Sequence, residues 1–164
     1  MRRTGVLMII AGWLLLAGLI WWVMDGQLER RSNPNAGLAL VVGAEGEVIL
    51  KRGRDGHYRA PGRINGHAVD FLVDTGATQV AIPKTLASAI GLRAGEAFQA
   101  QTANGLTLAY ATRLDSVALG SLEAREVAGT IIANEGTEEI LLGMSFLSRF
   151  AISIRDGEMR LRAR

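Results

Sequence analysis

The sequence has no cysteine among its 164 residues. That absence excludes disulfide bonds, thiol catalysis and every zinc site built on cysteine. The stability of the folded part must therefore come from its core. The length allows one domain with short additions and no more.

Histidine is nearly absent too, with only two residues in the chain. His57 and His67, even with Asp70 nearby, show no recurring spacing of metal ligands. We therefore expect no metal site and no other cofactor. A metal-dependent hydrolase is a rival interpretation, and it predicts loss of activity with chelators.

Charge of one sign does not dominate the domain. The formal net charge is +2, from 18 basic and 16 acidic side chains. Residues 1–44 hold four basic and two acidic side chains, whereas residues 45–164 hold fourteen of each. No basic stripe with interleaved aromatic residues is visible there, so nucleic-acid binding is not expected.

One long run lacks charge altogether. Residues 5–24 are uncharged, and about 20 such residues cross roughly 30 Å of hydrocarbon as a helix. Trp21 and Trp22 stand near its end, where indoles favour the membrane–water interface. A cleaved signal peptide is the alternative, but no small-x-small cleavage site follows. We expect residues 1–24 to form a short cytoplasmic N-terminus and a retained transmembrane anchor.

The cations around this run predict its orientation. Arg2, Arg3 and the amino terminus precede it, while acidic residues offset Arg30 and Arg31 after it. The positive-inside rule counts basic residues alone, so it favours an inside N-terminus only by a narrow margin. In a bacterium the protein would lie in the inner membrane, with its domain on the periplasmic side.

Two regions follow the predicted anchor. Residues 25–44 read as a linker, with an apolar patch at 38–42 that fits either a first strand or a stalk. Residues 45–164 have the sequence pattern of a β protein, with short apolar runs separated by turn dipeptides. Short helices are expected over residues 83–90 and 144–150. Strands are expected over residues 48–50, 57–64, 67–73, 99–102, 106–112, 117–119, 127–133, 140–142, 151–154 and 158–161.

The most informative motif is residues 71–78, FLVDTGAT. It places the Asp74 carboxylate at the end of an apolar strand, in a turn that Gly76 permits. A weak echo follows downstream, where residues 140–142 and Gly143 lead to the second short helix. Two such half-units facing each other predict a closed, mostly antiparallel barrel whose turns converge at one place.

In these segments the chain resembles the retropepsin-like aspartic proteases, and among them the single-domain, membrane-anchored bacterial members. The resemblance covers residues 45–164. It rests on LVDTGAT at 72–78, TANG at 102–105 and ILLGMSFL at 140–147. It implies an all-β acid-protease barrel with one or two short helices.

The resemblance also implies an aspartic endopeptidase that works as a homodimer. Two neighbouring carboxylates share one proton, so one acts as base toward water and the other as acid toward the carbonyl oxygen. Asp74 lies in the only Asp-Thr-Gly of the chain. Asp70 lies roughly 13 Å away along the same strand. The second carboxylate is therefore expected from Asp74 of another copy, across a two-fold axis.

Four loop residues receive roles by the same resemblance. Thr75 would hydrogen-bond across the dimer axis, and Gly76 would offer its amide to the carboxylate. Ala77 and Thr78 would line the substrate site beyond them. Ala77 replaces a hydroxyl found in pepsin-like relatives, which predicts activity at a less acidic pH than theirs.

The hairpin tip at Ala103, Asn104 and Gly105 is expected to be a flap over the substrate, with a plain surface hairpin as the alternative. Gly143 would underlie the catalytic loop, where a side chain would clash; a helix-capping glycine is the alternative. The segment around Ser145 lacks the second glycine of a nucleophile elbow, so Ser145 is not expected to be a nucleophile.

Retroviral members carry an arginine directly after the glycine that matches Gly143, and that arginine helps to fix the dimer. Met144 stands here instead, so another contact must stabilise the dimer.

The resulting prediction is a membrane-tethered aspartic endopeptidase acting on a protein or peptide near the membrane. The alternative is a scaffold or binding module that keeps the barrel without cleaving, although the intact motif at Asp74 argues against it.

Overall fold

The computed structural model describes residues 12–21, 33–37, 46–102, 105–133 and 139–164. From residue 46 onward the described chain is mostly strand, with two short helices. The helices are α2 (Lys84–Ala89) and α3 (Met144–Leu147). The strands are β1 (Glu47–Lys51), β2 (Tyr58–Ile64), β3 (His67–Val73), β4 (Val80–Pro83), β5 (Ala97–Thr102), β6 (Gly105–Leu119), β7 (Leu122–Ile132), β8 (Ile140–Leu142), β9 (Ala151–Arg155) and β10 (Glu158–Arg162).

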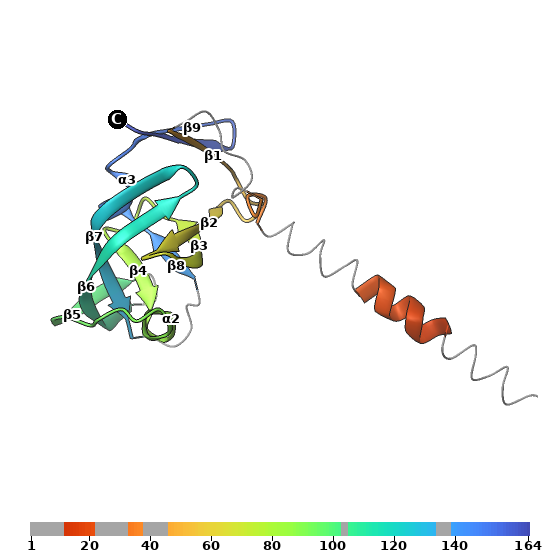
Figure 1. Ribbon diagram of the computed structural model, residues 1–164, viewed down its shortest axis with the longest axis horizontal. Helices are drawn as coiled ribbons and strands as arrows, with labels where there is room; N and C mark the ends of the chain where they lie inside the picture. The colour runs from red at the N-terminus through yellow and green to blue at the C-terminus, as the bar shows by residue number, and fades with distance from the viewer. Residues whose placement is uncertain (1–11, 22–32, 38–45, 103–104, 134–138) are drawn as a thin grey trace, which may run out of the picture.

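Seven strands form one sheet, in the order β2-β3-β8-β4-β7-β6-β5. A further pairing of β2 with β6 closes six of them into a barrel, and β5 extends beyond it as the partner of β6 (Figure 1). Most neighbours are antiparallel, but β3 pairs with β8 in parallel, as β4 does with β7. The expected closed and mostly antiparallel barrel is confirmed.

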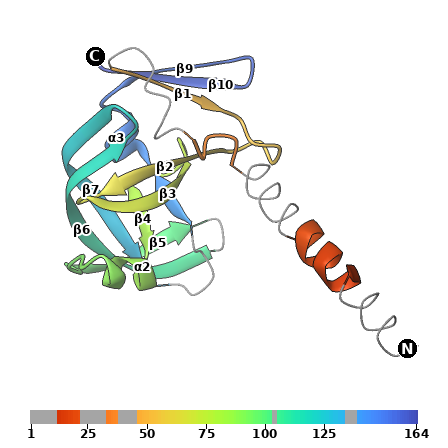
Figure 2. The same ribbon diagram turned by 45° about the vertical axis from the view of Figure 1, so that its right-hand side comes forward.

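The other three strands form a separate sheet in the order β1-β10-β9, which lies above the barrel in Figures 1 and 2. One face of this sheet is apolar. Val48, Leu50, Met159 and Leu161 are buried there and belong to the same hydrophobic core as the barrel. The core therefore joins the two sheets into one unit.

The barrel strands follow the alternation of a half-buried sheet. In β3, Val69, Phe71 and Val73 point into the core. Where β2 crosses β6, Gly62 has no room for a side chain. A Cβ there would lie 2.4 Å from the carbonyl oxygen of Ala118 and 2.5 Å from the Phe71 ring. The glycine thus allows the barrel to close.

Two of the expected hairpins have the predicted turns. Asn65 and Gly66, between β2 and β3, have φ angles of 49° and 83°. Asp156 and Gly157, between β9 and β10, have φ angles of 51° and 78°. Positive φ at both central residues matches the right-handed twist of the flanking strands.

Four elements differ from the expected ones. The strand β7 begins at Leu122, five residues before its expected start at residue 127. The strand β4 was not expected, because Pro83 suggested a helix start rather than the end of a short strand. The predicted strand 117–119 is the last part of the 15-residue β6, whose pairing with β7 continues through polar positions. The helix expected over 144–150 ends at Leu147.

The predicted membrane segment lies largely outside the described residues. Its described part, residues 12–21, is helical and exposed. Within the ranges that the structure describes, no helix is both long and apolar enough to cross a membrane. The apolar patch at residues 38–42 also lies outside the described residues.

Asn35 fastens the segment before the domain to the three-stranded sheet. Its side chain is 4% exposed. The amide nitrogen donates to the carbonyl oxygens of Lys51 and Arg59, both at 2.8 Å, and Oδ1 accepts from the Lys51 N–H at 2.7 Å. One amide group thus satisfies both backbone groups of Lys51 at the edge of β1.

We expect Asn35→Ala to lower the free energy of unfolding by about 1–3 kcal/mol, because it leaves the Lys51 N–H and two carbonyl groups without their partner. Denaturant unfolding followed by circular dichroism measures this loss. Gly37→Ala is the matched control, since a Cβ at Gly37 meets nothing within 4 Å. Equal midpoints for Asn35→Ala and the wild type would contradict the role of Asn35.

Candidate active site

The loop that carries Asp74 begins where β3 ends beside β8. The two strands run in parallel, with Val73 opposite Leu142. The Asp74 N–H donates to the carbonyl oxygen of Leu142 at 3.2 Å, which continues the strand pairing by one residue. The two half-units that echo each other in the sequence therefore lie side by side.

Backbone groups of its own loop orient the Asp74 carboxylate. Oδ1 accepts a hydrogen bond from the Gly76 N–H at 2.8 Å. The Ala77 N–H donates to the Asp74 carbonyl oxygen at 3.3 Å, which closes the turn. Asp74 is partly buried, whereas Thr75 and Gly76 are exposed. The tip of the loop therefore faces outward, beside the carboxylate.

The predicted contact of Thr75 lies across a dimer axis, so a single chain does not test it. The residue is exposed in the single chain. An exposed threonine next to an ordered carboxylate is compatible with a contact to a second copy. Gly76 is also exposed, on the same outward side of the loop.

The start of α3 holds the other half of the loop. The Met144 N–H donates to the carbonyl oxygen of Ala77 at 2.8 Å, and the Ser145 N–H donates to that of Thr78 at 2.9 Å. This close approach requires a glycine before the helix. A Cβ at Gly143 would lie 2.2 Å from the carbonyl oxygen of Gln79, a distance that backbone atoms do not tolerate.

Ser145 has a structural role that sequence reasoning missed. Its hydroxyl donates to the carbonyl oxygen of Ala128 at 2.7 Å and accepts from the Val80 N–H at 3.1 Å. It thereby joins α3 to β7 and to the start of β4. The available signal was a hydroxyl in the otherwise apolar run MSFL, beside the glycine of the second half-unit.

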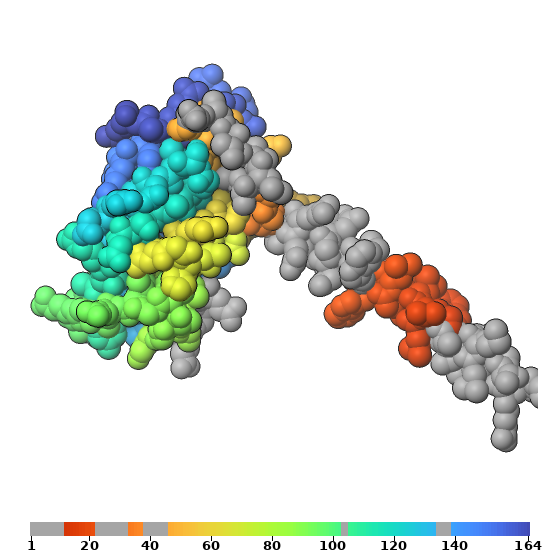
Figure 3. Space-filling view, viewed as in Figure 1, coloured from red at the N-terminus to blue at the C-terminus, as the bar shows by residue number. Residues whose placement is uncertain are grey.

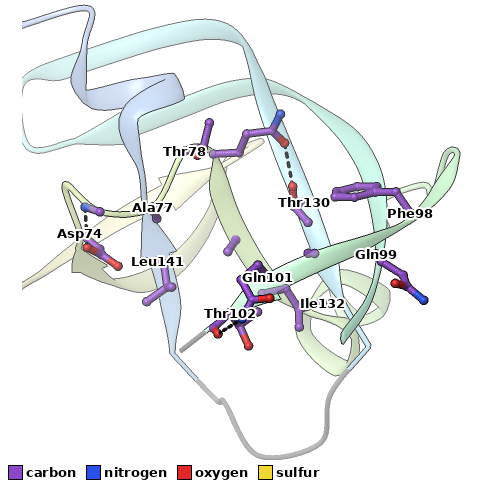
Figure 4. Close-up of a pocket in the computed structure, with 14 residues that line it drawn as sticks. Asp74, Ala77, Thr78, Phe98, Gln99, Gln101, Thr102, Thr130, Ile132 and Leu141 are labelled. Atoms are coloured by element: carbon purple, nitrogen blue, oxygen red, sulfur yellow. Dashed lines mark hydrogen bonds between the residues drawn. The ribbon is translucent and has the colours of Figure 1, made fainter. Parts of the chain in front are cut away.

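A cleft of about 520 Å³ opens between the Asp74 loop and β5. Figure 4 shows Asp74, Ala77 and Leu141 on one side of it, and Phe98 and Gln99 on the other. Its described lining comprises Asp74, Gly76, Ala77, Thr78, Gln79, Ala81, Phe98, Gln99, Ala100, Gln101, Thr102, Thr130, Ile132 and Leu141. In this lining Asp74 alone is ionisable, so the carboxylate stands among neutral groups.

One side-chain contact fixes the inner part of the cleft. Thr130 is 8% exposed, and its hydroxyl lies 2.7 Å from Oε1 of Gln79 (Figure 4). Thr130 donates this hydrogen bond, because the amide oxygen can only accept. Gln79 therefore lines the cleft in a fixed position.

The expected flap is the hairpin of β5 and β6. Its tip residues Ala103 and Asn104 lie outside the described residues. Gly105 has a φ of 104°, and its carbonyl oxygen accepts from the Thr102 hydroxyl at 2.8 Å. All cleft residues from 98 to 102 belong to β5. The hairpin thus forms one wall of the cleft.

A charged cluster lies next to the cleft. Arg59 forms ion pairs with Asp55 and, at 2.8 Å, with Glu139. The hydrogen bond that Arg59 donates to Glu139 is the main cause that raises the pKa of Arg59, and the one that it donates to Asp55 is the main cause that lowers the pKa of Asp55. Glu139 directly precedes β8, whose Leu141 lines the cleft. The cluster therefore links Arg59 on β2 to Glu139, the residue just before β8.

No metal site was expected, because the two histidines and Asp70 show no recurring spacing of metal ligands. Across the described ranges, no three His, Asp or Glu residues come together in a way that could hold an ion. His57 and His67 are both exposed.

Comparison with known proteins gives similar sequences and folds. Residues 60–149 match the family described as gag-polyprotein putative aspartyl protease. The crystal structure of a retropepsin-like aspartic protease from Rickettsia conorii has a TM-score of 0.60 and 30% identity, covering 72% of this chain and 91% of that chain. An uncharacterized protein in the cobV 5′ region of Sinorhizobium sp is 33% identical over 167 residues, covering 93% of this chain and 72% of that protein. An uncharacterized protein of Rickettsia prowazekii (strain Madrid E) is 36% identical over 109 residues, covering 64% of this chain and 46% of that protein.

We expect Ser145→Ala to lower the free energy of unfolding by about 1–3 kcal/mol, because the Val80 N–H loses its acceptor. Ser148→Ala is the matched control, at the residue directly after the same helix. The Ser148 hydroxyl bonds only to the Met144 carbonyl oxygen in its own turn, and the residue is exposed. Parallel denaturant titrations compare the two, and a loss for Ser148→Ala as large as that for Ser145→Ala would contradict the role of Ser145.

Proposed function

Because this chain belongs to the retropepsin-like aspartic protease family, we propose that it is an aspartic endopeptidase whose active site forms when two copies bring their Asp74 carboxylates together. Its substrate is a protein or peptide that enters the cleft between the Asp74 loop and β5. The observation that carries the proposal is the oriented Asp74 carboxylate at a cleft with no other ionisable group in its described lining.

The need for a second copy follows from the chemistry of amide hydrolysis. A water must lose a proton while the carbonyl oxygen and the leaving nitrogen gain protons, and a pair of carboxylates that shares one proton can do both. A single Asp74 supplies only half of this pair. Thr75 and Gly76 beside it are exposed, which leaves room for the second loop.

The hydrogen bond from Gly76 favours one orientation of the carboxylate before substrate arrives. A fixed acceptor of this kind lowers the reorganisation that the reaction needs. The β5–β6 hairpin would close over the peptide and exclude water, with Ala103 and Asn104 at its tip. Thr78 and Ala77 would line the path of the peptide on the opposite side.

The proposal includes a membrane location. The uncharged run at residues 5–24 would anchor the chain in the inner membrane, with the protease domain on the periplasmic side. Two domains held in one plane meet at a higher effective concentration than free ones. Substrates near the membrane surface would then be favoured.

A non-cleaving scaffold module is the second candidate function. Such a module would hold a peptide without cutting it in the same cleft, whose described lining is neutral apart from Asp74. The oriented carboxylate argues against it, because binding alone requires no aspartate at that position.

We expect Asp74→Asn to reduce peptide cleavage at least about 100-fold, since an amide can neither share nor accept the catalytic proton. The full-length chain in detergent is incubated with a mixed peptide library, and the products are identified by mass spectrometry. Asp70→Asn is the matched control, because Asp70 is an exposed aspartate on β3, the strand that leads to Asp74. Thermal unfolding of both variants checks the fold.

Each outcome of this assay has one meaning. Cleavage that survives in Asp70→Asn, disappears in Asp74→Asn and is indifferent to chelators supports the proposal. Equal behaviour of the wild type and Asp74→Asn favours the scaffold module. Loss of wild-type cleavage with a chelator favours the metal-dependent rival.

A further inference from the structure

Charge is unevenly distributed over the domain, although its total is balanced. Residues 51–59, which run from the end of β1 into β2, hold four basic side chains and one acidic side chain. Lys51, Arg52 and Arg54 are exposed, and none of them forms an ion pair with the described part of the chain. The single acidic residue, Asp55, is already paired with the fourth cation. The loop therefore presents cations without compensating anions.

The turn between β9 and β10 lies beside this loop. The Arg52 N–H donates to the carbonyl oxygen of Gly157 at 2.8 Å, which joins the two segments. Lys51 and Arg155 lie in one row across the sheet, on either side of Glu158. Glu158 is itself paired with an arginine of its own strand at 3.0 Å. The turn therefore adds another cation to those of the loop.

The balance of charge at this end of the sheet is positive. Exposed cations without an ion-pair partner among the described residues, which we call the basic end, are Lys51, Arg52, Arg54 and Arg155. Against these four stands one exposed acidic residue of the same turns, Asp156. Figure 3 shows the C-terminal segment, at the blue end of the colour scale, on the outside of the domain. Such an excess on a domain that is neutral in total indicates a surface for an anionic partner.

The segment that leads from the predicted anchor is fastened at the same place. The buried Asn35 side chain bonds to both the N–H and the carbonyl group of Lys51. Figures 1 and 2 show residues 33–37, in orange, beside the end of β1. Asn35 follows Met24, the last residue of the uncharged run, by eleven residues, which span at most about 40 Å when fully extended. The basic end therefore stays close to any bilayer that holds this run.

We propose that the basic end binds the anionic phospholipid headgroups of the bilayer that holds the anchor, and that this contact orients the protease domain on the membrane. One Lys or Arg near such a surface strengthens binding roughly fivefold. Because the anchor already confines the domain, a weak attraction of this size is sufficient to favour one orientation. The inference rests on the membrane location in the proposed function.

The observations favour a lipid surface over an acidic protein. A bilayer offers a plane of phosphate groups and requires no shaped pocket, and all four side chains of the basic end are exposed. The short connection from Met24 to Asn35 also brings this end, rather than another, next to the bilayer. An acidic protein would have to compete with headgroups that the anchor holds nearby.

The docked orientation has a consequence for the cleft. The walls of the cleft are the Asp74 loop and β5. Figures 1 and 2 show β5 at the opposite end of the barrel from the three-stranded sheet. Docking through the basic end would therefore keep the cleft away from the lipid and hold it at a constant height. Substrates would have to present their cleavage sites at that height.

A distance measurement tests the contact, and the lack of native cysteine allows one labelled position. Full-length His57→Cys, labelled with a fluorescent donor in the exposed loop, is reconstituted into vesicles with an acceptor on the lipid headgroups. We expect energy transfer to rise about twofold or more when phosphatidylcholine is mixed with about one-third phosphatidylglycerol. The rise should disappear at about 1 M salt, where screening limits attraction to about 3 Å.

Thr85→Cys is the matched label position. Thr85 is exposed on α2, which Figures 1 and 2 show at the other end of the barrel from residues 33–37. Its energy transfer should not rise when phosphatidylglycerol is added. An equal rise at both positions, or no rise at position 57, would overturn the proposal.

Charge removal tests the residues. Lys51→Gln with Arg54→Gln, in the His57→Cys background, should weaken docking about tenfold or more and return energy transfer to its value in neutral vesicles. Lys84→Gln with Arg93→Gln is the matched control, because it removes the same charge from two exposed cations elsewhere. Peptide cleavage in detergent should not change, since none of the four lines the cleft. Equal energy transfer in the two double variants would overturn the proposal.

The membrane location and the basic end can fail separately. Wild-type chain that floats only with anionic vesicles, and that salt releases, would contradict the anchor and support the basic end. Chain that floats with neutral vesicles after a carbonate wash, but whose energy transfer is equal in neutral and anionic vesicles, would support the anchor and overturn lipid binding. An acidic protein would then be the partner to test at the basic end.

Discussion

The site depends on the close approach between the Asp74 loop and the start of α3. Backbone hydrogen bonds from Met144 and Ser145 hold the carbonyl groups of Ala77 and Thr78, and the bare Cα of Gly143 makes this distance possible. On the other side, the Asp74 N–H continues the parallel pairing of β3 with β8. The carboxylate is thus positioned by backbone geometry. Side chains around it are therefore free to shape the cleft.

Much of this arrangement could be predicted from the sequence, because its signals are local. Asn65-Gly66 and Asp156-Gly157 determine their own turns through positive φ angles, and alternation places Val69, Phe71 and Val73 in the core. The echo between the two half-units predicted the barrel, and the family match agrees with it. The motif at Asp74 marked the loop, although its catalytic role stays a prediction.

The features that the sequence did not reveal depend on contacts between distant segments. The bonds of Ser145 to Ala128 and Val80 exist only once α3 packs against β7 and β4. Asn35 looked like a linker residue, because nothing near it indicates that Lys51 will present an open strand edge. The short strand β4 was not predicted, because Pro83 is compatible both with the end of a strand and with the start of a helix.

The central claim is that two Asp74 carboxylates from two copies form one catalytic site. The most direct test mixes wild-type chain with Asp74→Asn chain at constant total concentration and measures peptide cleavage after subunit exchange. If both copies must supply an aspartate, activity follows the square of the wild-type fraction, so an equal mixture retains about one quarter of the activity. Activity proportional to the wild-type fraction, with about one half retained in the same mixture, would contradict the claim.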